Sequence, residues 1–282
     1  MSHLTTDMKF AICNETFQDW PFERAFAFAR ECGYTGIEIA PFTMAADAKD
    51  ISAAQRDLVR EQAADAGLQV LGLHWLLAKT EGYHLTTPDD AVRRRTADYL
   101  GRLAGLCRDL GGSIMVFGSP PQRNLLPGVS LEQATDHAAE VLAAAMPALE
   151  QLDVTLALEP LGPSETDFLT TAAETVALIE RIGSPNCRLH LDVKAMSSEA
   201  EPIPVVIRNN AEYLAHFHAN DPNLQGPGFG DVDFVPIFEA LGEVDYRGWV
   251  SVEVFDYEPG IERLASQSID YMLECLERIR AK

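Results

Sequence analysis

Short apolar runs alternate with longer amphipathic segments along the whole chain. The apolar runs are bounded by polar and turn residues, as expected of strands buried on both faces, and the intervening segments repeat apolar residues at helical spacing. The segment after the first run begins at Pro21 and Phe22 and stops at Gly33, a common start and stop for a helix. The expected strands are 9–13, 36–40, 68–74, 113–117, 154–159, 188–192, 214–218 and 249–254.

Each expected strand is followed by a helical segment. The first helical segment stops at Gly33, and the other seven are expected at about 52–66, 89–110, 130–152, 171–182, 203–210, 234–241 and 261–279. Eight strand–helix units without a linker or composition break predict one (β/α)8, or TIM, barrel domain over residues 1–282. An open doubly wound sheet is the alternative. Its dinucleotide-binding form is disfavoured because the first strand–helix turn, 13–17, has no glycine, and the chain has no phosphate-loop motif.

Four of the expected strands end on side chains that can ligate a metal ion. These are Glu159, Asp192, His218 and Glu253, at intervals of 33, 26 and 35 residues. In a barrel the carboxyl ends of all strands meet on one face, where active sites lie. Three carboxylates so close together would repel one another without a cation. We therefore predict one divalent metal ion. Oxygen ligands with one imidazole favour Mn²⁺ and also suit Mg²⁺, Co²⁺ or Zn²⁺.

Composition narrows the classes of partner and compartment. The net charge of −21, from 43 acidic and 22 basic residues, disfavours nucleic acid and anionic membranes as partners. No apolar run is long enough to span a membrane, and residues 1–7 lack the features of a signal peptide. The five cysteines form no C-x-x-C pair, which favours buried free thiols, no structural zinc and a cytoplasmic location.

Other polar residues near the strand ends are candidates for the pocket. His74, Trp75 and Lys79 come from the third strand and its loop, and Lys194 follows Asp192 by two residues. We expect His74, Trp75 and Lys194 to contact substrate. Four further residues are weaker candidates for the pocket. Arg123 is a candidate anion contact, but a surface position is favoured for it. His190 is expected inside the barrel, and Glu15 and Glu38 either at the substrate or in fold-stabilising pairs.

Five motifs in order resemble a known group of enzymes. They are Leu158-Glu159-Pro160, His190-Leu191-Asp192-Val193, the run 216–221, the run 228–234 and Ser251-Val252-Glu253. The series is similar to the sugar phosphate isomerase/epimerase group of xylose-isomerase-like barrels, which includes the D-tagatose and D-psicose 3-epimerases and hydroxypyruvate isomerase. The resemblance implies that Glu159, Asp192, His218 and Glu253 bind the metal and that Glu165 binds substrate. The chain departs from the pattern of these epimerases at two positions, where Ala195 and Leu224 stand in place of a substrate-binding histidine and arginine.

The resemblance and the ligand set together predict a metal-dependent isomerase or epimerase of a small keto-sugar or polyol derivative. The metal would hold a carbonyl and a neighbouring hydroxyl and stabilise an enediolate, with Glu159 and Glu253 as acid and base on opposite faces. A metal-dependent lyase of a keto-sugar acid and a non-catalytic sugar-binding protein are the alternatives. The related apurinic endonucleases need further histidines that position 195 and the run 231–233 do not supply. A homo-oligomer remains open by analogy with such barrels.

Overall fold

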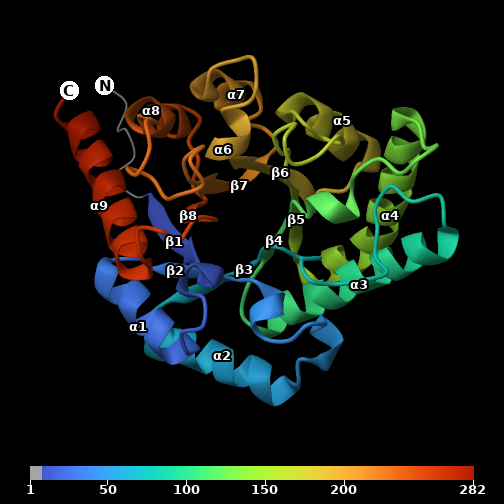
Figure 1. Cartoon of the computed structure of the whole chain (residues 1–282), viewed down its shortest axis with the longest axis horizontal. Helices are drawn as coiled ribbons and strands as arrows, with labels where there is room; N and C mark the ends of the chain where they lie inside the picture. The colour runs from blue at the N-terminus through green and yellow to red at the C-terminus, as the bar shows by residue number, and fades with distance from the viewer. Residues whose placement is uncertain (1–7) are drawn as a thin grey trace.

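Eight parallel strands form a closed barrel at the centre of the molecule (Figure 1). A computed structural model describes residues 8–282. Strand order follows chain order, and β1 (Lys9–Cys13) closes the barrel by pairing with β8 (Trp249–Val252). The others are β2 (Gly36–Ile39), β3 (Gln69–Leu73), β4 (Ile114–Phe117), β5 (Thr155–Leu158), β6 (Cys187–Asp192) and β7 (Leu214–Ala219). The pairing of β1 with β8 confirms the predicted barrel and is incompatible with an open sheet.

Helices surround the barrel, as Figure 1 shows. They are α1 (Phe22–Cys32), α2 (Ala53–Asp65), α3 (Asp90–Asp109), α4 (Leu131–Leu152), α5 (Ala172–Ile182), α7 (Ile203–Asn209), α8 (Val235–Glu243) and α9 (Ile261–Arg280). Their ends follow the sequence signals. Ser130 forms a capping box with Gln133 at the start of α4, and Gly33 ends α1 with a φ of 109° that favours glycine.

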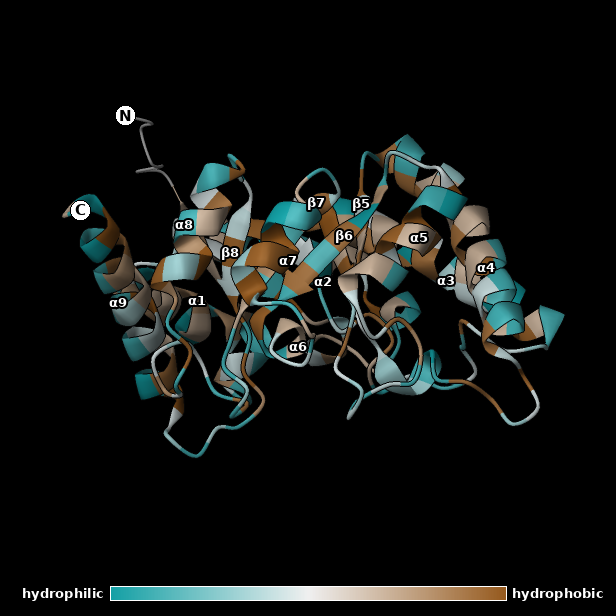
Figure 2. Ribbon diagram, turned by 90° about the horizontal axis from the view of Figure 1, so that it is seen from above, coloured by the Kyte–Doolittle hydropathy of each residue, from teal (hydrophilic) through white to brown (hydrophobic). Residues whose placement is uncertain are grey.

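A short helix that was not predicted, α6 (Val193–Met196), begins directly after β6. The side chain of Asp192 caps it by accepting a hydrogen bond from the backbone N–H of Ala195 at 2.8 Å. In Figure 2, α6 lies among the loops along one edge of the barrel. One oxygen of the Asp192 carboxylate is therefore fixed by local structure at the carboxyl end of its strand.

Apolar side chains of the strands and the inner helix faces form one core. Figure 2 shows hydrophobic segments in the strands and hydrophilic segments on the surrounding helices. Within residues 8–282, no helix has both the length and the apolar character needed to cross a membrane. The predicted absence of a signal peptide concerns residues 1–7, which lie outside the described range.

Arg123 is fully buried, so the expectation that it lies on the surface is wrong. Its guanidinium donates hydrogen bonds to the backbone carbonyls of Glu159, at 2.6 Å, and Leu169, at 3.1 Å. Burying the guanidinium is tolerated because these carbonyls satisfy its donors. Arg123 thereby joins the loop after β4 to the segment after β5 that carries the Glu159 side chain.

Candidate active site

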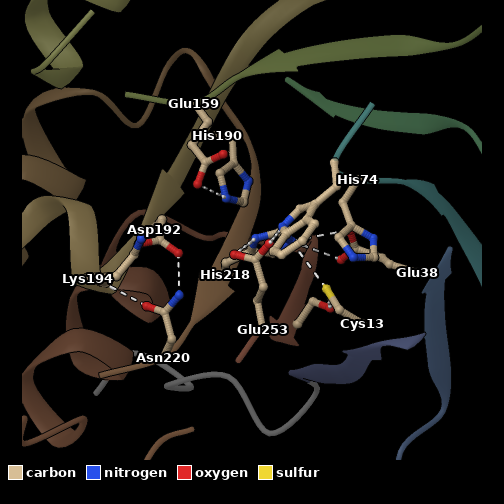
Figure 3. Close-up of polar contacts among 12 residues, drawn as sticks. Cys13, Glu38, His74, Glu159, His190, Asp192, Lys194, His218, Asn220 and Glu253 are labelled. Atoms are coloured by element: carbon tan, nitrogen blue, oxygen red, sulfur yellow. Dashed lines mark hydrogen bonds and ion pairs between the residues drawn. The ribbon is translucent and has the colours of Figure 1, made fainter. Parts of the chain in front are cut away.

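The four predicted metal ligands are all buried and lie at the carboxyl ends of their strands (Figure 3). Glu159 and Glu253 follow β5 and β8 directly, whereas Asp192 is the last residue of β6 and His218 the last but one of β7. One donor atom each from Glu159, Asp192 and His218 lies within 4.8 Å of the others. Glu253 adjoins this group through His218, because its Oε2 lies 3.1 Å from Nδ1 of His218, and its carboxylate also lies within 4.8 Å of donor atoms of Glu15 and His74.

Hydrogen bonds to neighbouring side chains orient two of these ligands. Nε2 of His218 faces Glu38, with the nearer carboxylate oxygen at 3.2 Å, which leaves Nδ1 directed toward Glu253. The amide of Asn220 donates to Oδ2 of Asp192 at 2.5 Å. Carboxylate–histidine contacts of this kind fix ring orientation and increase the basicity of a ligating imidazole. Sequence reasoning missed Asn220, although a polar residue directly after β7 was a usable signal.

The charges in this cluster favour a bound cation. Burial, followed by repulsion from Glu253 and Asp192, raises the pKa of Glu159 well above its usual range. Burial also raises the pKa of Asp192. Burial opposes protonation of His218, yet the carboxylates of Glu253 and Glu38 raise its pKa well above the usual value. The surroundings that retain a proton on His218 would also stabilise a metal ion, so the residues fit the predicted divalent ion.

His190 lies inside the barrel, as expected, and belongs to the same cluster. Its Nε2 lies 4.0 Å from Oε1 of Glu159, and its ring centroid lies 4.2 Å from that of His218. Both ring nitrogens are buried without a hydrogen-bond partner among the described residues. A buried, unpaired imidazole among carboxylates is a further candidate donor toward an ion.

A cavity of about 370 Å³ adjoins the cluster, because Glu159 belongs to both. Both Glu159 and Glu253 line it, together with Trp75, Glu165 and Lys194. The remaining lining residues are Ala78, Lys79, Gly118, Ser119, Pro120, Pro121, Gln122, Leu161 and Phe255. At Gly118 a Cβ atom would collide with the carboxylate of Glu159, so glycine leaves the space that this side chain occupies. The two carboxylates therefore face one cavity.

The residues predicted to contact substrate divide into two groups. Trp75, Lys194 and Glu165 line the cavity, and Lys194 Nζ donates to Oε1 of Glu165 at 2.7 Å. His74 does not line it. It is fully buried, with Nε2 2.5 Å from Oε2 of Glu15. Glu15 and Glu38 thus both form pairs with histidines inside the barrel.

Comparison with known proteins places the chain among barrels of this kind. A family model described as "Xylose isomerase-like TIM barrel" matches residues 26–275. The chain belongs to this family. This confirms the resemblance inferred from the ordered strand-end motifs.

Proteins that resemble this chain include several epimerases. An L-ribulose 3-epimerase from Mesorhizobium japonicum is 31% identical over 254 residues, which cover 87% of this chain and 80% of that protein. A fructoselysine 3-epimerase from Escherichia coli O157:H7 is 24% identical over 272 residues, 94% of each chain. A solved structure of an L-ribulose 3-epimerase has a TM-score of 0.84 at 26% identity, covering 98% of this chain and 96% of that one.

Proposed function

We propose that the protein is a divalent-metal-dependent epimerase or isomerase of ketoses. The observation that carries this proposal is that Glu159 and Glu253 line one cavity, and that Glu159 also belongs to a buried cluster of predicted metal ligands. Epimerisation needs two acid/base groups that reach opposite faces of one carbon atom. The ends of β5 and β8, which are not adjacent in the barrel, supply two such groups.

Glu159, Asp192, His218 and Glu253 would hold the ion, and Mn²⁺ suits this donor set. When bound, it would polarise the ketone oxygen and stabilise the negative charge that proton removal leaves on the substrate. Trp75 orients the Glu253 carboxylate, because its indole N–H donates a hydrogen bond to Oε1 at 2.6 Å. One glutamate removes the proton from the carbon next to the ketone. The other returns a proton to the opposite face and so inverts that carbon.

Three residues in the cavity suit the remaining atoms of a sugar. Lys194 can donate to a hydroxyl oxygen, and Glu165 can accept from a hydroxyl group. Trp75 contributes an apolar edge next to Phe255. His74 lies outside the lining of the cavity, because it is fully buried and paired with Glu15. We assign it to the support of the barrel interior rather than to sugar binding.

The names of the relatives support epimerisation over the two alternatives. The three reported above are epimerases of L-ribulose or fructoselysine, and none is a lyase. A pure binding protein would not need two buried carboxylates over a ligand cluster. The negative charge of the chain agrees with a small sugar, and not nucleic acid, as the partner. Free thiols at all five cysteines agree with a cytoplasmic location.

The decisive experiment is proton exchange in D₂O with Mn²⁺ and a panel of pentuloses and hexuloses. We expect deuterium at the carbon next to the ketone, together with formation of the epimer or isomer. Release of water or carbon dioxide would instead identify a lyase. Failure to exchange any ketose, despite binding detected by calorimetry, would identify a binding protein and refute the proposal.

A further inference from the structure

A second cavity, of about 520 Å³, adjoins the catalytic one. The two cavities share Glu165, Lys194 and Phe255 in their walls. The side chains of Glu165 and Lys194 are paired at 2.7 Å, so this ion pair stands at the junction of the two spaces. A molecule bound next to Glu159 and Glu253 can therefore continue past the pair into the second cavity.

The ion pair at the junction has unused hydrogen-bonding capacity. Lys194 is nearly buried, with 9% of its side chain exposed, and its ammonium lies 4.3 Å from the centroid of the Phe255 ring. An ammonium carries three donors, whereas Glu165 is its one hydrogen-bond partner within residues 8–282. Glu165 is 30% exposed and retains acceptor positions on its carboxylate. A donor beside an acceptor is the arrangement that recognises neighbouring hydroxyl groups of a sugar.

The rest of the second cavity is uncharged and partly hydroxylated. Apart from the shared residues, its lining consists of Gly162, Ser164, Ser197, Ser198, Pro222 and Leu224. The hydroxyls of Ser197 and Ser198 donate to backbone carbonyls, at 2.8 and 2.7 Å, which leaves their oxygens free to accept hydrogen bonds. The cavity thus offers polar contacts without a net charge.

Leu224 gives this cavity an apolar wall at an energetic cost. Its side chain is 43% exposed, and its φ of 71° is unusual for a residue other than glycine. The conformation is held because its carbonyl accepts hydrogen bonds from the backbone N–H groups of Phe255 and Asp256, at 2.8 and 2.9 Å. Strained backbone that the surroundings enforce is frequent at binding sites.

We propose, on the basis of the proposed function, that the substrate is a ketose extended by an uncharged, hydroxylated group such as a second sugar ring. The ketose occupies the catalytic cavity, and the extension occupies the second one. Lys194 donates to a hydroxyl at the junction while Glu165 accepts from its neighbour, and the serine oxygens and Leu224 contact the extension. Lys194 and Glu165 are therefore specificity-determining residues for the length of the substrate.

The charges that line the second cavity favour an uncharged extension over a phosphate or a carboxylate. Lys194 is the cavity's single cationic side chain, and Glu165 neutralises it. An anionic group placed here would lie beside the Glu165 carboxylate without a second cation to offset the repulsion. Recognition of phosphate normally uses several donors or an unpaired cation.

The test compares two substrates that differ only in the extension. One is a free ketohexose, and the other is the same ketose carrying a glucosyl group at the end away from the ketone. We expect the wild-type enzyme with Mn²⁺ to favour the glucosylated ketose by about tenfold or more in kcat/KM. Ser164→Trp fills the second cavity and should lower this ratio by about tenfold. Ser113→Trp, an exposed serine at the opposite end of the barrel, is the matched control and should leave the ratio unchanged.

The outcomes separate the two proposals. Equal kcat/KM values for the two substrates, with a ratio that Ser164→Trp does not change, would overturn the second cavity as a subsite while leaving epimerase activity intact. Preference for a phosphorylated ketose over the glucosylated one would overturn the assignment of an uncharged extension. Absence of turnover with every ketose, free or extended, would overturn the proposed function and this inference with it.

Discussion

Trp75 and Glu253 are 178 positions apart in the sequence, yet the indole N–H donates to the carboxylate at 2.6 Å. The Trp75 ring is stacked on Phe255 at a centroid distance of 5.8 Å and lies against Phe42 at 5.6 Å. Its φ of 51° is a genuine outlier for a bulky side chain, so aromatic packing maintains a strained backbone. We infer that Trp75 positions one oxygen of Glu253 while His218 faces the other.

Replacing Trp75 with Phe tests this positioning role, because Phe retains aromatic packing and removes the donor. A hydrogen bond to a charged group contributes about 1.5–3 kcal/mol, so we expect kcat to fall roughly 10- to 100-fold with little change in KM. Steady-state kinetics on a turned-over ketose measures both parameters. A large rise in KM at constant kcat would instead indicate that Trp75 acts through direct contact with the sugar.

Replacing Glu159 or Glu253 with Gln removes the proposed acid/base group while retaining side-chain size. General acid–base catalysis typically contributes about 10²- to 10⁴-fold, and either variant should lose at least that much turnover. Circular dichroism should report an intact fold. Glu132→Gln, in the first turn of α4 and remote from the cavity, is the control and should keep full activity. Near-normal deuterium exchange in either site variant would rule out the assigned role.

Removal of divalent metal should lower both activity and thermal stability. Buried carboxylates at Glu159, Asp192 and Glu253 repel one another, and a bound cation relieves that repulsion. Free Mn²⁺ at 100 times its Kd would stabilise the fold by about 2.7 kcal/mol, which calorimetry detects as a rise in Tm. Asp192→Asn keeps an oxygen to cap α6 but removes a negative charge, and so should abolish most of this rise. An equal Tm with and without metal would contradict the predicted centre.

The barrel and the positions of its strand ends were readable from sequence because both depend on local pattern. Apolar runs and helix signals recur in each unit, and closure then brings the strand ends to one face. Glu159 and Glu253 were predicted to be site residues because each ends an apolar run, and the structure places each directly after its strand. The boundaries were less exact, since β8 ends at Val252 and β7 continues to Ala219.

Contacts that depend on loop conformation were not readable. The burial of Arg123 arises because its loop folds back onto the carbonyls of Glu159 and Leu169, which no spacing rule predicts. The enclosure of His74 by Glu15 and the hydrogen bond of Trp75 to Glu253 join units far apart in sequence. The residue types at these positions indicate which hydrogen bonds each side chain can make, but tertiary packing determines which residue is the partner.

The buried cysteines predict how stability changes at alkaline pH. Burial raises the pKa of the Cys107 thiol to about 12, while an exposed thiol in the unfolded chain has a pKa of about 8.5. The fold therefore favours the neutral thiol. The contribution of the buried neutral thiol to the free energy of unfolding is fully present below pH 8.5 and is lost as the pH rises toward 12. Between pH 9 and 10 each such thiol should reduce the free energy of unfolding by about 1.4 kcal/mol per pH unit.

Cys107→Ser isolates this effect, because the serine hydroxyl does not titrate in this range. The Cys107 thiol donates to the carbonyl of Ile114 at 3.4 Å, and the hydroxyl can make a similar contact. Urea unfolding at several pH values should give a shallower alkaline decline for the variant than for the wild type. Cys187, whose pKa burial also raises to about 12, remains in both proteins, so some decline should persist. Identical slopes would mean that the Cys107 thiol ionises as readily in the fold as in the unfolded chain.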